Sequence, residues 1–288
     1  MSYTDQIFEF AKASTPDLYW LTVIEDGVSQ TRQISPSNQT NNCYSVSKAF
    51  TVTALGMLFD EGKLSVDEKI VDIFKDELIP DMDEKWQEVT VDMVMRHRYG
   101  IARGYLDIDA EPVGEFERLY GSRDDFLKIV FSAKLPKVLG TDFCYSDAAY
   151  YLLSRVCQKK SGEDLYDYLR TRLFNPMHFE EAAWTKCPQG YSMGATGLYI
   201  RSADIAKLAQ LYLQKGVYNG QRLLSQAWCE TVFERGYELG RCADGIYAKG
   251  GMCGQMVCLD QKKGLAIGWL GYETQGGSGK MLNYLKNL

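Results

Sequence analysis

The sequence predicts an α+β fold in which one antiparallel sheet, built from N- and C-terminal segments and flanked by helices, carries an inserted, mostly helical lobe. Residues 18–34 and 245–272 are strand-like, whereas the region between about 60 and 190 has mostly helical and loop patterns. The 288 residues are 45% hydrophobic and 24% charged, which is typical of a globular chain with a large core. We expect a single domain over 1–288. Its α/β lobe would comprise about 1–60 plus 190–288, and its helical lobe about 61–189.

The N-terminal third predicts a helix, a hairpin and a second helix. Residues 4–13 form the first amphipathic segment, and 18–34 alternate as a hairpin that turns at Glu25-Asp26-Gly27. From Ser45 onward the apolar residues recur at helical spacing, and Gly62 is a plausible helix stop.

The rest of the chain passes from helices back to strands. Helices are predicted over 147–158, 162–173 and 202–215, the last followed by a turn at Tyr218-Asn219-Gly220. Residues 245–272 are then strand-like, with IYAKGGMCGQMVCLD, a DQKKG turn and GLAIGWLGY, and the chain ends with the helix-like KMLNYLKNL. Strands at both ends with helices between them predict one sheet with an insertion.

Charge and composition argue against several classes of partner. The net charge of -6 and the pI near 5.2, without any arginine- or lysine-rich block, disfavour nucleic acid and anionic membranes. The N-terminus lacks the features of a signal peptide and no apolar run reaches the length of a membrane span, so we expect a cytoplasmic protein. Eight cysteines without a CxxC pair, and two histidines, predict reduced thiols, no metal site and no cofactor.

Ser45-Val46-Ser47-Lys48 is the first candidate catalytic motif. A serine hydroxyl is a poor nucleophile until a base removes its proton, and Lys48 lies three positions after Ser45 on the same helix face. In the first helical turn, free N–H groups and the positive dipole end would favour a developing oxyanion. The alternative is a polar helix start in which Ser45 is a cap and Lys48 is solvated. Ser47, followed at that spacing by Phe50, is interpreted as a bystander.

Two further motifs, Tyr145-Ser146-Asp147 and Lys249-Gly250-Gly251, follow in the chain. Together with Ser45 and Lys48, in this order, they resemble the serine β-lactamase, DD-peptidase and esterase superfamily, especially its class C-like branch. The resemblance runs from about residue 17 to 272 and includes YSDAAYYLLSRVCQKKSGEDLYDYLRTRLFNPMHF and GATGLYIRSADIAKLAQLYLQKGVYNGQRLLSQAW. It implies a penicillin-binding-protein-like fold. It also implies a serine hydrolase that cleaves an ester or amide of a small molecule or short peptide through an acyl-serine.

The resemblance implies a role for each motif residue. Ser45 would carry the acyl group, Lys48 would hold positive charge beside it and relay its proton, and Tyr145 would act as general base and then general acid. The backbone N–H groups of Ser45 and Met252 would form the oxyanion hole. The remaining motif residues would face the substrate: Asp147, Lys249, Gly250 and Gly251.

The motifs depart from the family pattern at three places. Asp147 stands where many β-lactam-active members carry asparagine, and an ionised carboxylate only accepts hydrogen bonds. Gly250 replaces a threonine, whose hydroxyl lies near the substrate carboxylate in family members, although the retained Lys249 leaves an anionic substrate group open. Arg98-Tyr99-Gly100 replaces the family's threonine-serine-glycine turn. We therefore favour esterase or small amide or peptide hydrolysis, with weak or absent β-lactam turnover.

Each motif also has a plainer interpretation. Tyr145 could pack an aromatic core, Lys249 could be a solvated strand-end cation, and the two glycines could form a bulge. His97 and His178 are interpreted as structural. The near-motif cysteines are interpreted as packing residues in preference to a redox site: Cys43, Cys144 and Cys253. For the whole chain, the alternative function is a catalytically weak or inactive penicillin-binding-like homologue that keeps a ligand site.

Overall fold

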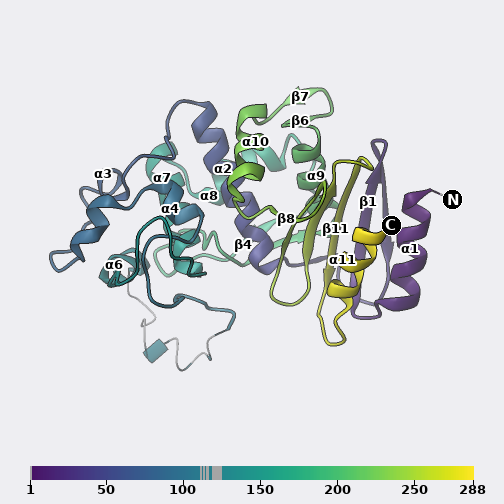
Figure 1. Cartoon of the computed structure of the whole chain (residues 1–288), viewed down its shortest axis with the longest axis horizontal. Coiled ribbons are helices and arrows are strands. Elements are labelled where there is room, and N and C mark those ends of the chain that lie inside the picture. Colours follow the sequence, from purple (N-terminus) through teal and green to yellow (C-terminus); the bar gives the residue numbers. More distant parts are fainter. Residues whose placement is uncertain (1, 111, 113, 115–116, 119–124) are drawn as a thin grey trace. The chain divides into compact units, whose positions relative to one another are not determined.

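The computed structural model describes residues 2–110, 112, 114, 117–118 and 125–288 (Figure 1). The chain divides into two compact units. The first comprises Met1–Ala49, Arg172–Ala183 and Gly197–Leu288, and the second comprises Phe50–Thr171 and Trp184–Thr196. The first unit combines an antiparallel sheet with helices, and the described part of the second is mostly helical, so the α+β prediction is confirmed.

The main sheet of the first unit has six strands in the order β2-β1-β11-β10-β9-β8. Its centre joins the two ends of the chain, as predicted, because β1 pairs antiparallel with β11 (Figure 1). The predicted hairpin is present, with Asp26 (φ 51°) and Gly27 (φ 78°) both in the left-handed region that a two-residue turn requires. The strands are β1 (Leu18–Glu25), β2 (Val28–Gln33), β8 (Gly240–Ala243), β9 (Ile246–Gly250), β10 (Met256–Asp260) and β11 (Leu265–Gly271).

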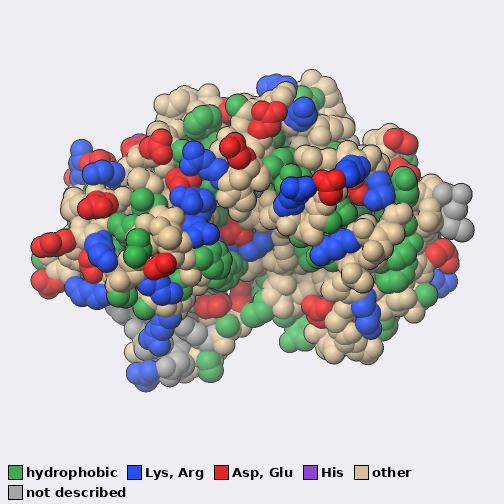
Figure 2. All heavy atoms as spheres, viewed as in Figure 1, with side chains coloured by type: hydrophobic (Ala, Val, Ile, Leu, Met, Phe, Trp, Pro, Cys, Tyr) green, Lys and Arg blue, Asp and Glu red, His purple; other side chains and the backbone are tan. Residues whose placement is uncertain are grey.

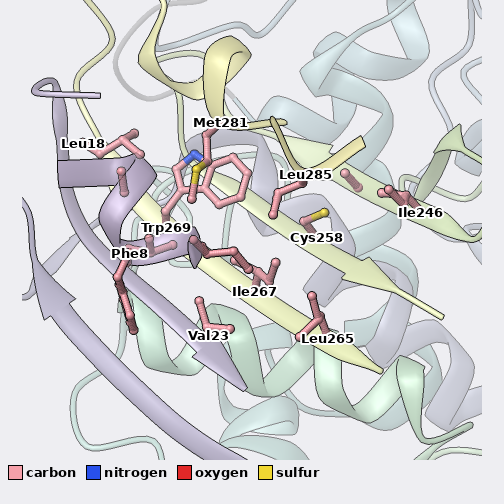
Figure 3. Close-up of a cluster of buried hydrophobic side chains, with 14 residues drawn as sticks. Phe8, Leu18, Val23, Ile246, Cys258, Leu265, Ile267, Trp269, Met281 and Leu285 are labelled. Atoms are coloured by element: carbon pink, nitrogen blue, oxygen red, sulfur yellow. The ribbon is translucent and has the colours of Figure 1, made fainter. Parts of the chain in front are cut away.

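Helices cover both faces of this sheet. On one face, α1 (Tyr3–Ser14) and α11 (Gly277–Asn287) bury Phe8 and Met281 against Trp269 and its neighbours (Figure 3). On the other face lies α9 (Ser202–Leu213), so close that a Cβ on Gly268 of β11 would come within 2.5 Å of a carbonyl of that helix. All of β11 is buried for this reason, which explains why its sequence is continuously apolar instead of alternating.

Asp17 ties the start of β1 to the start of α11. Its carboxylate, 7% exposed, accepts hydrogen bonds from the backbone N–H groups of Thr274 (3.1 Å), Gln275 (2.9 Å) and Gly277 (3.2 Å). Burial by itself would raise the pKa of this carboxyl, but the three N–H donors outweigh it and hold the pKa below its ordinary value. The ionised carboxylate therefore holds the two ends of the chain together.

Several short elements have no counterpart in the sequence prediction. One is a three-stranded sheet in the order β3-β5-β4, formed by β3 (Thr40–Asn42), β5 (Leu198–Arg201) and β4 (Ala183–Trp184). Another is α10 (Gln226–Arg235), and β8 is a third. The predicted turn after α9 is present between β6 (Val217–Tyr218) and β7 (Gln221–Arg222).

In the second unit, α7 (Asp147–Ser161) is buried along most of its length and packs against α3, α4, α6 and α8. The helix predicted over 162–173 is shorter and begins at Leu165, because Gly162 adopts φ 79° as the cap of α7 and Asp164 caps the next helix. The other elements are α2 (Ser47–Asp60), which starts in the first unit, α3 (Ile70–Ile73), 3-10 helix Glu84–Glu88, α4 (Val91–Met95), α6 (Phe126–Ser132), α8 (Leu165–Leu169) and a π-helical turn, Arg170–Phe174, that ends in the first unit.

The surface in Figure 2 intersperses lysine and arginine with aspartate and glutamate, and shows no broad basic field on that face. Within the described ranges, no helix is both long enough and apolar enough to cross a membrane.

Candidate active site

Ser45 lies in a tight turn, two residues before α2. The prediction placed it inside the first turn of the helix, but the chain forms a 3-10 helix over Tyr44–Val46, and regular α2 begins at Ser47. One reason is that Tyr44 adopts φ 48°, which a right-handed α-helix does not accommodate, and its N–H donates to Asn42 Oδ1 at 2.9 Å. A non-glycine residue held at positive φ beside the candidate nucleophile is the kind of strain found at functional sites.

Lys48 donates from Nζ to Ser45 Oγ at 2.9 Å. Ser45 lies in the 3-10 helix and Lys48 in the first turn of α2, and side chains three residues apart on consecutive helical turns are neighbours, so the spacing seen in the sequence produces this contact. The Lys48 side chain is fully buried, with 0% exposure, whereas Ser45 is partly exposed. The alternative of a solvated Lys48 is therefore wrong, because the long cationic side chain is enclosed and donates to the Ser45 hydroxyl.

The turn that carries Ser45 is attached to β5. Cys43 donates its N–H to the Leu198 carbonyl at 2.8 Å, and Ser47 Oγ accepts from the Leu198 N–H at 3.3 Å. Ser47 Oγ also lies 3.4 Å from Cys43 Sγ. Ser47 is thus occupied in fixing the turn. Burial raises the pKa of Cys43 to about 12, so its thiol stays protonated at neutral pH and behaves as a packing group.

The end of β9 packs against this same turn. A Cβ placed on Gly251 would lie 2.7 Å from the carbonyl oxygen of Cys43, so the two backbones approach more closely than any side chain allows. Gly250 is less confined, since its nearest neighbour would be the flexible end of Met256 at 3.4 Å. The first unit therefore brings Ser45, Lys48 and the Lys249-Gly250-Gly251 motif together.

Met252 follows in the turn between β9 and β10. This turn is held by Gly251 N–H to Gln255 O at 2.8 Å and Gly254 N–H to Gly251 O at 3.1 Å. Within the part of the chain that the structure describes, the Met252 N–H donates no hydrogen bond, and its side chain is 51% exposed. A backbone donor that is unused in this way remains available to an oxygen of a ligand.

Lys249 forms an ion pair with Glu238, a residue that the sequence analysis missed. The side chains of Lys249 and Glu238 are 14% and 4% exposed, so the lysine is not the solvated strand-end cation of the alternative interpretation. The signal that could have found Glu238 is the Asp244-Gly245 dipeptide, a two-residue hairpin turn that folds the preceding chain back along β9.

Tyr145 belongs to the second unit, where its ring lies on His97. The ring centroids are 4.6 Å apart at an interplanar angle of 34°, and Tyr145 is 37% exposed. His97 is buried and adopts φ 55°; its Nδ1 accepts from the Ser146 N–H at 3.3 Å, and its carbonyl accepts from the Cys144 N–H at 2.8 Å. His97 thus positions the Tyr145 loop through both a ring nitrogen and its carbonyl, as its structural interpretation predicts.

The loop has a second support. A Cβ on Gly104 would lie 2.6 Å from the Tyr145 carbonyl oxygen, and Ser146 Oγ exchanges hydrogen bonds with the backbone of Tyr105, both at 3.2 Å. Asp147 is 4% exposed and is the first residue of α7, where a carboxylate is favoured by the helix dipole. Loop and helix start together hold Tyr145 and Asp147 in fixed positions within the second unit.

The Arg98-Tyr99-Gly100 turn also lies in the second unit. Arg98 donates to the Thr141 carbonyl, and Gly100 adopts φ 92° against Leu139. The Tyr99 hydroxyl is buried without a partner in the described structure. The turn lies beside the Tyr145 loop because the chain continues from His97 directly into it.

Among the described residues, no cluster of three or more His, Cys, Asp or Glu side chains could hold a metal ion, and all eight cysteines are free. The chemistry available in the first unit is that of a hydroxyl, a buried cation and backbone donors.

The chain is similar in sequence to known proteins. The family model described as Beta-lactamase matches residues 38–286. The chain is 26% identical over 290 residues to penicillin-binding protein 4 of Amycolatopsis lactamdurans, covering 84% of this chain and 67% of that protein. It is 25% identical over 239 residues to the 6-aminohexanoate-dimer hydrolase of Paenarthrobacter ureafaciens, covering 78% of this chain and 59% of the relative.

The fold is shared with solved structures. A penicillin-binding protein homologue from Caulobacter crescentus superimposes with a TM-score of 0.73 at 14% identity, covering 98% of this chain and 96% of that one.

Proposed function

This chain belongs to the β-lactamase family, and on that premise we propose that it is a serine hydrolase that cleaves an ester or amide bond through an acyl-Ser45 intermediate. The observation that carries the proposal is the 2.9 Å hydrogen bond between Lys48 Nζ and Ser45 Oγ, made by a lysine with no solvent exposure. A serine that only caps a helix gains nothing from a buried cation beside it. A serine that must lose its proton does gain, because the cation stabilises the negative charge that develops on its oxygen.

In the proposed reaction, Ser45 Oγ attacks the acyl carbon and forms the new C–O bond. Its proton passes to Tyr145, acting as a phenolate, either directly or through Lys48, which gives up one of its own protons as it takes the proton of the serine. The carbonyl oxygen becomes an oxyanion, which the Met252 and Ser45 N–H groups stabilise. Collapse of this intermediate breaks the bond to the leaving group, which takes up the proton. Water then attacks the acyl-enzyme by the same route in reverse and releases the acid. The roles of Tyr145 and Asp147 come from their motif, and the preorganised loop in the second unit supports them.

The proposed substrate is a small molecule or short peptide with an ester or amide bond. Asp147 and Gly250 favour such a substrate over penicillins. Asp147 is a carboxylate where many β-lactam-active members have the amide of asparagine, and Gly250 lacks the hydroxyl of the usual threonine. The relatives' names include a hydrolase, which supports the reaction class.

The proposal is tested with p-nitrophenyl butyrate and a fluorophosphonate probe. Wild-type protein is expected to release p-nitrophenol and to be labelled at one serine, and Ser45→Ala is expected to lose both. Ser29→Ala is the matched control, since Ser29 is exposed on β2 at the opposite edge of the main sheet from β8. Turnover that persists in Ser45→Ala refutes the assignment. Stoichiometric labelling without turnover supports the alternative, a ligand-binding homologue.

A further inference from the structure

Glu238 cancels the charge that the third motif brings to the site. The Lys249 and Glu238 side chains are both largely buried, so water screens their attraction little. The positive charge of Lys249 is therefore already neutralised by Glu238 before any substrate binds. From the sequence alone, the positive charge of Lys249 was compatible with a substrate that carries an anionic group. The structure changes that expectation.

The chain around Glu238 is built to place this carboxylate. Gly236 ends α10 at φ 68°, Tyr237 is fully buried, and Glu238 itself adopts φ 61°, an uncommon conformation for a residue with a side chain. Gly240 then pairs with Ala248, and continuing that antiparallel register by two residues brings Glu238 alongside Gly250. The carboxylate therefore lies at the end of β9 because backbone geometry places it there.

Among the described residues of the first unit, four large apolar side chains are exposed, and three of them lie near the end of β9 or the turn that carries Ser45; the fourth, Val28, lies on β2 at the other edge of the main sheet. Tyr199 (42% exposed) pairs with Asn42 where β5 lies beside β3, and Asn42 is three residues before Ser45 in the chain. Met252 (51% exposed) follows the glycine that contacts Cys43. Tyr272 (54% exposed) adjoins this turn, since the next residue donates its N–H to the Cys253 carbonyl at 2.9 Å. Exposed apolar groups gathered in one place mark a surface that receives an apolar ligand.

We propose that the acyl group received by the first unit is uncharged and apolar, and that Glu238 sets this specificity by keeping Lys249 from binding a substrate carboxylate. This inference rests on the proposed serine hydrolase function. The neutralised lysine removes the attraction for an anion, and Tyr199, Met252 and Tyr272 supply contact for a hydrocarbon chain.

The test compares three p-nitrophenyl esters whose acyl groups each have four carbons: butyrate, the hemisuccinate, which ends in a carboxylate, and 4-aminobutyrate, which ends in an ammonium. The readout is the ratio of kcat/KM between esters, which a general loss of folded protein does not change. Wild-type protein is expected to prefer butyrate over both charged esters by at least about tenfold, the factor that corresponds to 1.4 kcal/mol.

Glu238→Gln uncovers the Lys249 charge, and the butyrate-to-hemisuccinate ratio is expected to fall about tenfold. The double variant Glu238→Gln/Lys249→Met removes both charges and is expected to restore the wild-type ratio, a reversal that no structural role of Glu238 produces. Asp244→Asn is the matched control, because Asp244 lies in the turn between β8 and β9 and forms an exposed ion pair with Lys262 of the turn between β10 and β11.

Wild-type preference for either charged ester overturns the inference, and so does an unchanged ratio in folded Glu238→Gln. If Glu238→Gln does not fold, the wild-type and double-variant ratios still decide: a double variant that prefers the hemisuccinate contradicts the inference. Failure here is distinct from failure of the proposed function. If the proposed function is wrong, none of the three esters shows Ser45-dependent turnover. If only this inference is wrong, Ser45-dependent turnover is present but has the wrong preference among the esters.

Discussion

Gly251→Ala is expected to force the end of β9 away from the turn that carries Ser45. The added Cβ would lie 2.7 Å from the Cys43 carbonyl oxygen and 2.7 Å from Gln255 Oε1. Neither neighbour yields easily. The first is backbone fixed to β5 by the Cys43 N–H, and the second belongs to a side chain 2% exposed, whose Nε2 donates to the Gly271 carbonyl at 2.7 Å.

The magnitude follows from this confinement. Forcing a methyl group into well-packed surroundings costs about 1–3 kcal/mol, and each kcal/mol lowers Tm by about 2–4 °C in domains of 150–250 residues. We therefore expect Tm to fall by roughly 2–12 °C. The displaced Cys43 carbonyl lies two residues before Ser45, and misplacement of a catalytic group by about 1 Å can cost on the order of 10²-fold. A smaller shift is expected to reduce kcat/KM for p-nitrophenyl butyrate about tenfold.

Gly250→Ala is the matched control, one residue away in the same motif. Its Cβ would meet the end of the Met256 side chain at 3.4 Å and the Gln255 carbonyl oxygen at 3.7 Å, both ordinary contacts. Thermal unfolding followed by circular dichroism, and ester turnover, are measured on both variants. Equal losses in Tm and kcat/KM for the two would refute the reasoning, because it derives the difference from one close backbone approach.

Three further predictions concern single groups. Asp17→Asn is expected to lower the free energy of unfolding at pH 7 by about 1.5–3 kcal/mol; because the folded-state pKa is lowered, this difference should shrink as pH falls below about 4 in urea titrations, and a constant difference would contradict it. Cys43 should resist iodoacetamide at pH 8 in native protein while the less buried Cys144 and Cys253 react first, as read by peptide mass spectrometry; early modification of Cys43 would show that it is reactive. Lys48→Met should lower kcat about 10²–10⁴-fold with Tm nearly retained, since an unbranched apolar chain fits the buried position; an unchanged kcat would remove Lys48 from the mechanism.

The long elements could be predicted because their signals are local. The β1–β2 hairpin follows from alternation around Asp26-Gly27, and α2 ends near Gly62 because glycine alone takes φ 68° at no cost. Short elements were missed for the opposite reason. The strands of the small sheet are two to four residues long, too short for any period to show, and they form only because distant backbone segments pair.

The candidate site divides in the same way. The contact between Ser45 and Lys48 could be predicted from the sequence, because a separation of three residues places both side chains on the same side of a helical turn. The 3-10 geometry of that turn could not be predicted from the sequence, because it depends on the left-handed conformation of Tyr44 and on hydrogen bonds to Leu198, more than 150 residues away.

What the sequence by itself determined is therefore the class of chemistry: three motifs in order, the nucleophile candidate and its lysine, and the order of strands and helices. Only the tertiary structure decided how that chemistry is tuned. The antiparallel register of β8 with β9 brings Glu238 to Lys249, and the approach of β9 to Cys43 allows only glycine at position 251. Spacing along the chain governs contacts within a turn, whereas charge pairing and close packing between strands depend on register, which is set by the whole sheet.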